Sequence, residues 1–194
     1  SAGVDSLVHA TEAFVAKKSN PIAKMFAKEG FNIVLRNLPR LTQNLESIEL
    51  REKVMYGAFL SAIALMNSGT GPAAAMSYPL GVRFGVPHGI GGGIFLPHVI
   101  RHNIDKGCFE YARLMDTKDG EKSGQESSLE FINLLLKVWD ELSVPRNLND
   151  FGMGMNDIDN FISDTMGLKL ALDQNPIPFY GNEIKNTLDL LLRD

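Results

Sequence analysis

The sequence has little cysteine and no long apolar run. Its single cysteine, Cys108, excludes an intrachain disulfide and a metal cluster held by thiolates. This suits a reducing compartment, and we expect a cytoplasmic protein. No stretch reaches the roughly 18 consecutive apolar residues of a membrane span, so no membrane partner is expected. The start of the chain also has no basic segment followed by an apolar one, so no signal peptide is predicted.

Positive charge is not in excess either. Lys and Arg number 19 against 23 Asp and Glu, and the net charge of −4 argues against a nucleic-acid partner. Hydrophobic residues make up 44% of the 194 residues and charged residues 22%, which is ordinary for a globular protein. A chain of this length can bury a substantial core.

The alternating pattern of a half-buried strand is missing, and no segment repeats. Apolar residues recur at helical spacing along most of the chain instead. We therefore predict an all-α fold: one domain over residues 1–194, a multi-helix bundle of roughly eight to ten helices. We expect helices over residues 1–16, from Pro21 to a break at Pro39, over 47–68, from Ala73 to the Tyr78-Pro79 junction, over 87–95, from Pro97 onward, over 127–142, over 157–166 and from Gly181 onward.

The pattern also predicts three local features. Asn20 before Pro21 is predicted to cap the second helix. Residues 116–126 are polar and are predicted to form a surface loop. In the helix over 47–68, small residues such as Gly57 and Ser61 predict a closely packed neighbouring helix, and a single apolar stripe is formed by Ile48, Met55, Phe59, Ala62 and Met66.

Asp5 and His9 are the first candidate functional residues. They are four positions apart, so in a helix they lie on one face, and Glu12 follows at i+7 from Asp5. A carboxylate and an imidazole placed in this way can bind a divalent cation from one side. The alternative is a solvated polar face, or an aspartate that hydrogen-bonds its own histidine.

His88 is the second candidate, in the sequence Pro87-His88-Gly89. Between a stiff proline and a glycine, the histidine lies on backbone that other groups can approach closely, which suits a metal ligand or a proton donor. Together with Asp5 and His9 it would give two imidazoles and one carboxylate, a set that suits Fe(II), or Zn(II) with a water. The alternative is a histidine in an irregular turn.

The glycines after His88 do not form a phosphate-binding loop of the Walker type. The lysine and hydroxyl of that motif are missing, and no strand precedes the run. We predict that Gly89, Gly91, Gly92 and Gly93 serve close helix packing. His98 and His102 also share a helix face, and we predict that they are structural or surface residues.

Nearly the whole chain resembles, in order, the helical domain of the iron-containing (group III) alcohol dehydrogenases. In the tail, 142–152 and Asn175-Pro176 match the family, and two earlier segments carry its signature residues. One is the opening AGVDSLVHATEAFVAKKSNP, with the family's Asp-x-x-x-His-x-x-Glu pattern before an Asn-Pro helix. The other is the central stretch, where the family signature commonly reads His-Ala-Met-Ala-His-Pro-Leu-Gly, followed by Pro-His-Gly and Leu-Pro-His-Val-x-x-x-Asn. The matching residues here are Met76, 79–81, 87–89, 96–99 and Asn103.

The resemblance implies specific roles. It places the family's metal ligands on Asp5, His9 and His88, but its middle metal histidine falls on Ala74, which has no donor atom. The family's second signature histidine, near substrate and nicotinamide, falls on Tyr78, so Tyr78 is the predicted proton relay or substrate contact. Residues 77–79, Ser-Tyr-Pro, also resemble branches of the family that reduce specialised aldehydes.

The resemblance further implies a fold and a reaction. The fold is the C-terminal domain of the dehydroquinate synthase-like and iron-containing alcohol dehydrogenase fold. The reaction is NAD(P)-dependent oxidation of a small alcohol or reduction of an aldehyde at Fe(II) or Zn(II). The nucleotide-binding domain that normally precedes this domain is missing from the sequence, so we expect the chain alone to be inactive. A homo-oligomer is compatible with this assignment.

Two other hypotheses stay open. The loss of a ligand at Ala74 suggests a degenerate relative that lost metal and activity and acts as a binding or assembly module. The same superfold also includes relatives of glycerol dehydrogenase and dehydroquinate synthase, which would bring zinc and different chemistry.

Overall fold

Helices are the only regular secondary structure in the residues that the computed structural model describes, 1–115 and 123–193, and no strand is found among them. The predicted all-α class is confirmed. The α-helices are α1 (Ala2–Val15), α2 (Pro21–Gln43), α3 (Ile48–Ser68), α4 (Pro72–Phe84), α5 (His88–Asp105), α6 (Gly124–Glu141), α7 (Ile158–Gly167), α8 (Lys169–Leu172) and α9 (Gly181–Leu191). Short 3-10 helices are η1 (Glu110–Leu114), η2 (Asn149–Phe151) and η3 (Met155–Asp157).

The predicted loop over 116–126 falls mainly on residues 116–122, which lie outside the described residues. Residues 124–126 instead form the first turn of α6, which begins at a capping box: the Ser123 hydroxyl accepts from the Glu126 backbone N–H, and the Glu126 carboxylate accepts from the Ser123 N–H. The predicted Asn20 cap of α2 is confirmed, since its side-chain oxygen accepts from the Ala23 N–H at 3.0 Å.

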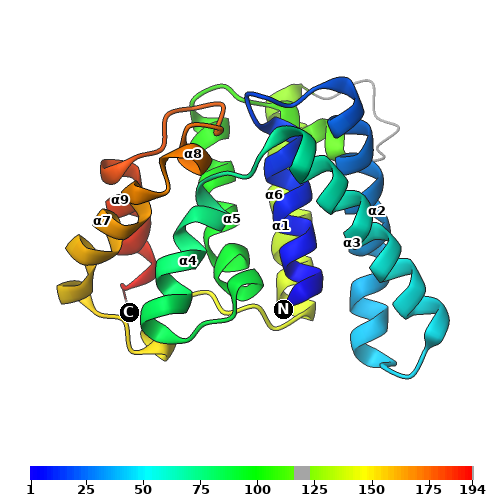
Figure 1. Ribbon diagram of the computed structural model, residues 1–194, viewed down its shortest axis with the longest axis horizontal. Helices are drawn as coiled ribbons and strands as arrows, with labels where there is room; N and C mark the ends of the chain where they lie inside the picture. The colour runs from blue at the N-terminus through cyan, green and yellow to red at the C-terminus, as the bar shows by residue number, and fades with distance from the viewer. Residues whose placement is uncertain (116–122, 194) are drawn as a thin grey trace.

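Helix α1 is the central element of the fold. Figure 1 shows the antiparallel pair α2 and α3 at one end of the molecule and α7, α8 and α9 at the other, with α1, α4, α5 and α6 between them. Leu7 and Val8 are fully buried, and α1 packs against α2, α3 and α5. The polar residues of α1 are therefore held on a scaffold that is fixed from several sides. No helix in the described part of the chain is long and apolar enough to cross a membrane.

Three prolines that were predicted to end or begin helices lie inside them. Pro39, Pro79 and Pro97 are interior residues of α2, α4 and α5. A proline lacks the N–H that would reach the carbonyl four residues earlier. For Pro97 that carbonyl belongs to Gly93, and the indole N–H of Trp139 donates to it at 2.7 Å. A residue of α6 thus compensates the lost bond, and α5 continues unbroken from His88 to Asp105 where two helices were predicted.

The apolar stripe predicted on α3 is not the buried face of this helix. Ile48, Met55, Phe59 and Met66 are exposed, at 72%, 71%, 60% and 86% of their surface. The opposite face is buried, and its members are smaller on average: Leu50, Val54, Gly57, Leu60, Ser61, Ala64 and Ser68. Close packing against α2 selects that small-residue face, because large side chains would hold the two helices apart.

The crossing of α2 and α3 depends on Gly30 and Gly57. A Cβ at Gly30 would lie 2.7 Å from the Gly57 carbonyl oxygen and 2.8 Å from the Ser61 backbone nitrogen. A Cβ at Gly57 would in turn lie 2.8 Å from a methyl group of Val34. The prediction from Gly57 and Ser61 that a helix approaches closely is confirmed, and α2 is that helix.

Substituting Gly30→Ala should therefore destabilise the chain. We expect a loss of about 1–3 kcal/mol in the free energy of unfolding, because the new methyl group meets backbone atoms that have little freedom to move. Gly167→Ala is the matched control: Gly167 ends α7, and a Cβ there meets no atom within 4 Å. It should leave stability unchanged or raise it by about 0.5–1 kcal/mol. Urea unfolding followed by circular dichroism measures both, and equal stabilities would contradict the crossing described here.

Candidate metal centre

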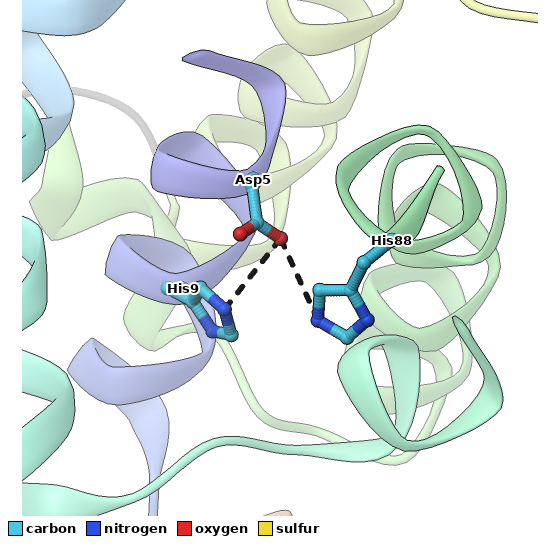
Figure 2. Close-up of side chains that lie close together, drawn as sticks. All are labelled: Asp5, His9 and His88. Atoms are coloured by element: carbon cyan, nitrogen blue, oxygen red, sulfur yellow. Dashed lines mark ion pairs between the residues drawn. The ribbon is translucent and has the colours of Figure 1, made fainter. Parts of the chain in front are cut away.

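The structure brings Asp5, His9 and His88 together. Asp5 and His9 lie one turn apart on α1, and His88 is the first residue of α5. One ligand atom from each residue lies within 4.8 Å of the other two. Figure 2 shows the Asp5 carboxylate between the two imidazole rings, which approach it from different helices. In the described part of the chain, this is the one group of at least three such residues with metal-binding spacing.

The glycine run places His88 beside α1. A Cβ at Gly89 would collide with the Ser1 carbonyl oxygen and would lie 2.7 Å from the Asp5 Cβ. Gly92 and Gly93 face Val8 and Val4 of α1 in the same way, at 3.2 and 2.8 Å. The prediction that these glycines serve close helix packing is confirmed. Their consequence for the site is that the N-terminus of α5 can approach Asp5 closely.

His88 is held from the other side by α4. Its Nδ1 lies 2.5 Å and its Nε2 lies 3.4 Å from the Ser77 hydroxyl, which also donates to the Ala74 carbonyl at 2.6 Å. The Tyr78 ring packs on the imidazole with 4.7 Å between ring centroids. Gly85, in the left-handed conformation with φ of 69°, ends α4 and lets the chain turn back toward α5.

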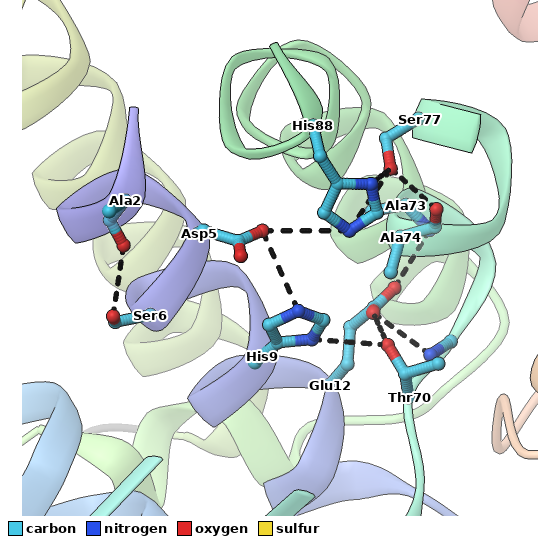
Figure 3. A network of polar contacts seen from close by, with 11 residues as sticks. Ala2, Asp5, Ser6, His9, Glu12, Thr70, Ala73, Ala74, Ser77 and His88 are labelled. Atoms are coloured by element: carbon cyan, nitrogen blue, oxygen red, sulfur yellow. Dashed lines mark hydrogen bonds and ion pairs between the residues drawn. The ribbon is translucent and has the colours of Figure 1, made fainter. Parts of the chain in front are cut away.

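His9 is held by the connection between α3 and α4. Its Nδ1 lies 3.3 Å from the Thr70 hydroxyl, which donates to the Glu12 carboxylate at 2.8 Å. That carboxylate is buried and also accepts from the backbone N–H groups of Gly71, at 2.8 Å, and Ala73, at 2.7 Å. Figure 3 shows this chain of contacts running from His9 to Thr70 and Glu12, with Ser77 and His88 above it in the view.

The space around Asp5 fits a cation. Its Oδ1 atom is buried and has no hydrogen-bond partner among the described residues. It lies 3.5 Å from Nε2 of His9 and 3.6 Å from Nε2 of His88, longer than an ordinary hydrogen bond. Two metal bonds of about 2.0–2.2 Å that meet at a tetrahedral angle place their donor atoms about 3.4 Å apart. Each imidazole nitrogen is therefore spaced from the carboxylate oxygen as two ligands of one ion would be.

Burial and neighbouring charges change the pKa values of Asp5, His9 and His88 in different directions. Burial by itself would raise the pKa of Asp5, but the neighbouring imidazoles of His9 and His88 outweigh it and lower that pKa. Burial would lower the pKa of His9, yet the carboxylates of Asp5 and Glu12 raise it above its ordinary value. Burial dominates at His88 and lowers its pKa. His9 is thus the imidazole that holds a proton more tightly when no metal is bound.

Glu12 is fully buried next to this group. Burial raises the pKa of its carboxyl above the ordinary value, although hydrogen bonds from Thr70, Gly71 and Ala73 favour the charged form. Three donors point at its two oxygens, and an added proton would disturb this arrangement. The geometry therefore belongs to the ionised carboxylate.

The structure also locates the positions where the sequence departs from the expected ligand set. Ala74 is 1% exposed and contributes only its carbonyl, which accepts from Ser77. Tyr78, the predicted proton relay, has 56% of its surface exposed and contacts the site through its ring on His88. The supporting hydroxyls of Thr70 and Ser77 were not predicted, because neither has a spacing signal that links it to a histidine distant in sequence.

A hollow of about 490 Å³ opens beside the site. Its lining includes Thr70 and Tyr78, which contact His9 and His88, and continues over Leu168, Leu170 and Ala171. Asp5, His9 and His88 do not line this hollow themselves, so it adjoins the site through Thr70 and Tyr78.

The other two histidines lie outside this group. His102 donates from Nε2 to the Pro178 carbonyl at 3.0 Å and packs edge-on against Phe179. His98 lines a separate hollow with Trp139 and Arg146. This arrangement agrees with the prediction of structural or surface roles.

Known proteins resemble the chain over nearly its whole length. A sequence model of the Fe-containing alcohol dehydrogenase family, C-terminal, matches residues 1–192. The 1,3-propanediol dehydrogenase of Citrobacter freundii is 28% identical over 155 residues, which cover 78% of this chain and 40% of that protein. The chain thus spans less than half the length of this curated relative.

Solved structures share the fold. A 1,3-propanediol oxidoreductase superimposes with a TM-score of 0.90 at 25% identity, covering 97% of this chain and 50% of the other. The sulfoacetaldehyde reductase from Bifidobacterium kashiwanohense, solved in complex with NAD⁺, gives a TM-score of 0.86 at 23% identity, covering 98% and 49%. The second likeness concerns the fold alone.

Metal binding should depend on pH in a direction set by His9. In the metal-free chain, protonated His9 beside Asp5 contributes stability that is fully present below the ordinary histidine pKa of about 6.5 and is lost as the pH rises through its raised folded-state pKa. A metal ion needs the neutral imidazole. We expect the rise in melting temperature on adding Zn(II) to be small at about pH 5.5 and to grow toward about pH 8. Differential scanning calorimetry measures it, and a shift independent of pH would contradict the assignment of His9.

Proposed function

The chain belongs to the Fe-containing alcohol dehydrogenase family, and we propose that it is the metal-binding, substrate-cleft half of an NAD(P)-dependent alcohol dehydrogenase or aldehyde reductase. The observation that carries the proposal is the buried Asp5 oxygen. It lacks a hydrogen-bond partner among the described residues and faces two imidazole nitrogens at metal-ligand spacing. A divalent cation satisfies all three groups at once, and the family favours Fe(II), with Zn(II) as the alternative ion.

Each residue near the site has a proposed role. Asp5, His9 and His88 would hold the ion, which when bound would supply a Lewis acid for an alcohol or aldehyde oxygen, while NAD(P) would exchange the hydride. The exposed Tyr78 ring on His88 places a phenol beside the hollow, where its hydroxyl is able to give a proton to a substrate oxygen or take one from it.

The hollow beside the site would hold the rest of the substrate. Leu168, Leu170 and Ala171 give part of its wall an apolar surface, and Thr70 and Tyr78 lie at the side nearest the candidate ligands. A small aliphatic alcohol or aldehyde suits this lining, with its oxygen toward Asp5 and its carbon chain along the leucines.

The nicotinamide cofactor would come from a nucleotide-binding domain that is not part of this sequence. The chain covers 40% of the Citrobacter freundii relative and 50% of the 1,3-propanediol oxidoreductase structure. The described residues contain neither a parallel sheet nor the glycine turn that normally binds a dinucleotide. We therefore propose that the redox step needs the second half.

A second candidate function follows from Ala74. A family member that lost one ligand position, and with it the metal, would keep the fold as a binding or assembly module. Metal binding separates the two candidates, because the module would bind no metal at this site.

The decisive experiment measures metal binding with a matched pair of variants. The purified chain should bind Fe(II) in the absence of oxygen, or Zn(II), in calorimetric titrations against a competing chelator. His88→Ala should abolish binding at micromolar metal, because one carboxylate and one imidazole remain. His102→Gln removes a histidine outside the group and should bind as the unchanged chain does. Absence of binding by the unchanged, folded chain would favour the module.

The chain alone should also show no NAD(P)-dependent alcohol oxidation, and turnover by it would refute the need for a second half.

The lost ligand position gives a further prediction. Ala74 and Tyr78 are four positions apart on α4, and residue 74 lies in the same turn as the Ser77 that contacts His88. Ala74→His should supply a fourth donor and tighten metal binding by at least an order of magnitude, or about 1.4 kcal/mol. Ala74→Leu is the control for bulk at this buried position and should bring no gain. Unchanged affinity in a folded Ala74→His variant would show that residue 74 does not face the ion.

A further inference from the structure

We propose that Glu12 and Thr70 are positioning residues that fix the tautomer of His9, so that its Nε2 lone pair points at Asp5. This inference rests on the proposed metal site. It assigns a function to a buried carboxylate and to a loop hydroxyl that lie outside the candidate ligand set.

The argument begins with the proton of Thr70. A threonine hydroxyl has one proton to donate. Oγ1 of Thr70 lies 2.8 Å from Oε2 of Glu12 and 3.3 Å from Nδ1 of His9. An ionised carboxylate only accepts, so the shorter of the two contacts takes the hydroxyl proton. Toward His9, Oγ1 is then left with lone pairs alone.

The consequence for His9 is a fixed direction of its ring proton. A neutral imidazole carries one N–H, and the nitrogen that bears it is set by the hydrogen bond available. Opposite the lone pairs of Thr70, Nδ1 is the favourable place for the proton. Nε2 then presents its own lone pair on the opposite side of the ring, where Oδ1 of Asp5 lies at 3.5 Å. In this tautomer the lone pair of Nε2 is free to bind a cation.

Glu12 is well suited to this task because it cannot turn away. It lies three residues after His9 on α1, and its oxygens also hold the N–H groups of Gly71 and Ala73 at the beginning of α4. A Cβ at Gly71 would lie 2.8 Å from Oε1 of Glu12, so the carboxylate is packed as well as hydrogen-bonded. These contacts fix the acceptor for Thr70 and join α1 to α4 at the level of the site.

The test separates the hydroxyl from the helix cap. Thr70→Val has nearly the same shape and leaves the two backbone bonds to Glu12 in place, but it removes the hydroxyl. Thr70→Ser restores the hydroxyl. The chain is labelled with ¹⁵N-histidine, and long-range ¹H–¹⁵N spectra of the metal-free protein are recorded at rising pH until the His9 signals no longer move, because the raised pKa of His9 keeps its ring protonated to higher pH than an ordinary histidine. A His9→Asn variant identifies the His9 signals.

The unchanged chain and Thr70→Ser should show His9 with its proton on Nδ1. Thr70→Val should shift the proton toward Nε2, where it can be donated to Asp5. In the same variant Zn(II) affinity should fall by about 10–100-fold, the usual effect of removing a partner of a metal ligand, while Thr70→Ser should bind within about threefold of the unchanged chain.

The melting temperatures of the metal-free proteins decide whether the role is one of stability alone. A Thr70→Val variant that melts earlier but keeps the Nδ1–H tautomer and the metal affinity would overturn the inference. So would an unchanged chain with its proton on Nε2. If the unchanged chain binds no metal at all, the proposed function fails, but the spectrum still tests the fixed tautomer.

Discussion

The close approach of α5 to α1 at Gly89 is the constraint on which the candidate site depends. No side chain separates the first turn of α5 from the backbone of Ser1 and from Asp5, because a Cβ at residue 89 would occupy the space of both. His88 precedes this contact by one residue, so its imidazole is delivered beside Asp5. Without the glycine, the two helices would lie farther apart and the two imidazoles would no longer share one carboxylate oxygen.

A second layer of contacts turns this proximity into a defined geometry. The hydroxyl of Thr70, which is held by the carboxylate of Glu12, contacts His9, and the hydroxyl of Ser77 contacts His88. These groups come from α1, from the α3–α4 connection and from α4. Since α4 also packs along α5, the ring of His88 is held by the same helix whose beginning is tied to Glu12. His9 and His88 are thus both supported by residues that are linked to α4.

Much of this could be predicted from the sequence, because local patterns carry it. Helical spacing gave the all-α class and most helix positions, and the i, i+4 spacing brought Asp5 and His9 to one face. That His88 belongs with them came from the family resemblance, since nothing local links residue 88 to residue 5. The helix breaks at Pro39, Pro79 and Pro97 were wrong. For Pro97 the compensating hydrogen bond to the Gly93 carbonyl comes from Trp139, which lies 46 positions after Gly93.

The buried face of α3 was wrong for a related reason. Helical spacing grouped Ile48, Met55, Phe59 and Met66 as one apolar stripe, but the partner helix meets α3 at Gly57 and Ser61, where small residues allow contact between backbones. Likewise the role of Thr70 depends on a contact across 61 positions. Such features are decided by which elements meet, and periodicity within one helix contains no information about that.

The separation of the candidate ligands along the chain has a consequence for folding. His9 and His88 close a loop of about 80 residues, and in an unfolded chain such a closure costs about 4–5 kcal/mol of entropy. A disordered chain would therefore present the aspartate–histidine pair of α1 and the histidine of α5 as separate, weak binders. Tight binding of a metal ion therefore requires that α1 and α5 have already packed together. At the proposed site, metal uptake would accordingly be a late event in maturation, and a bound ion would slow the separation of the two helices.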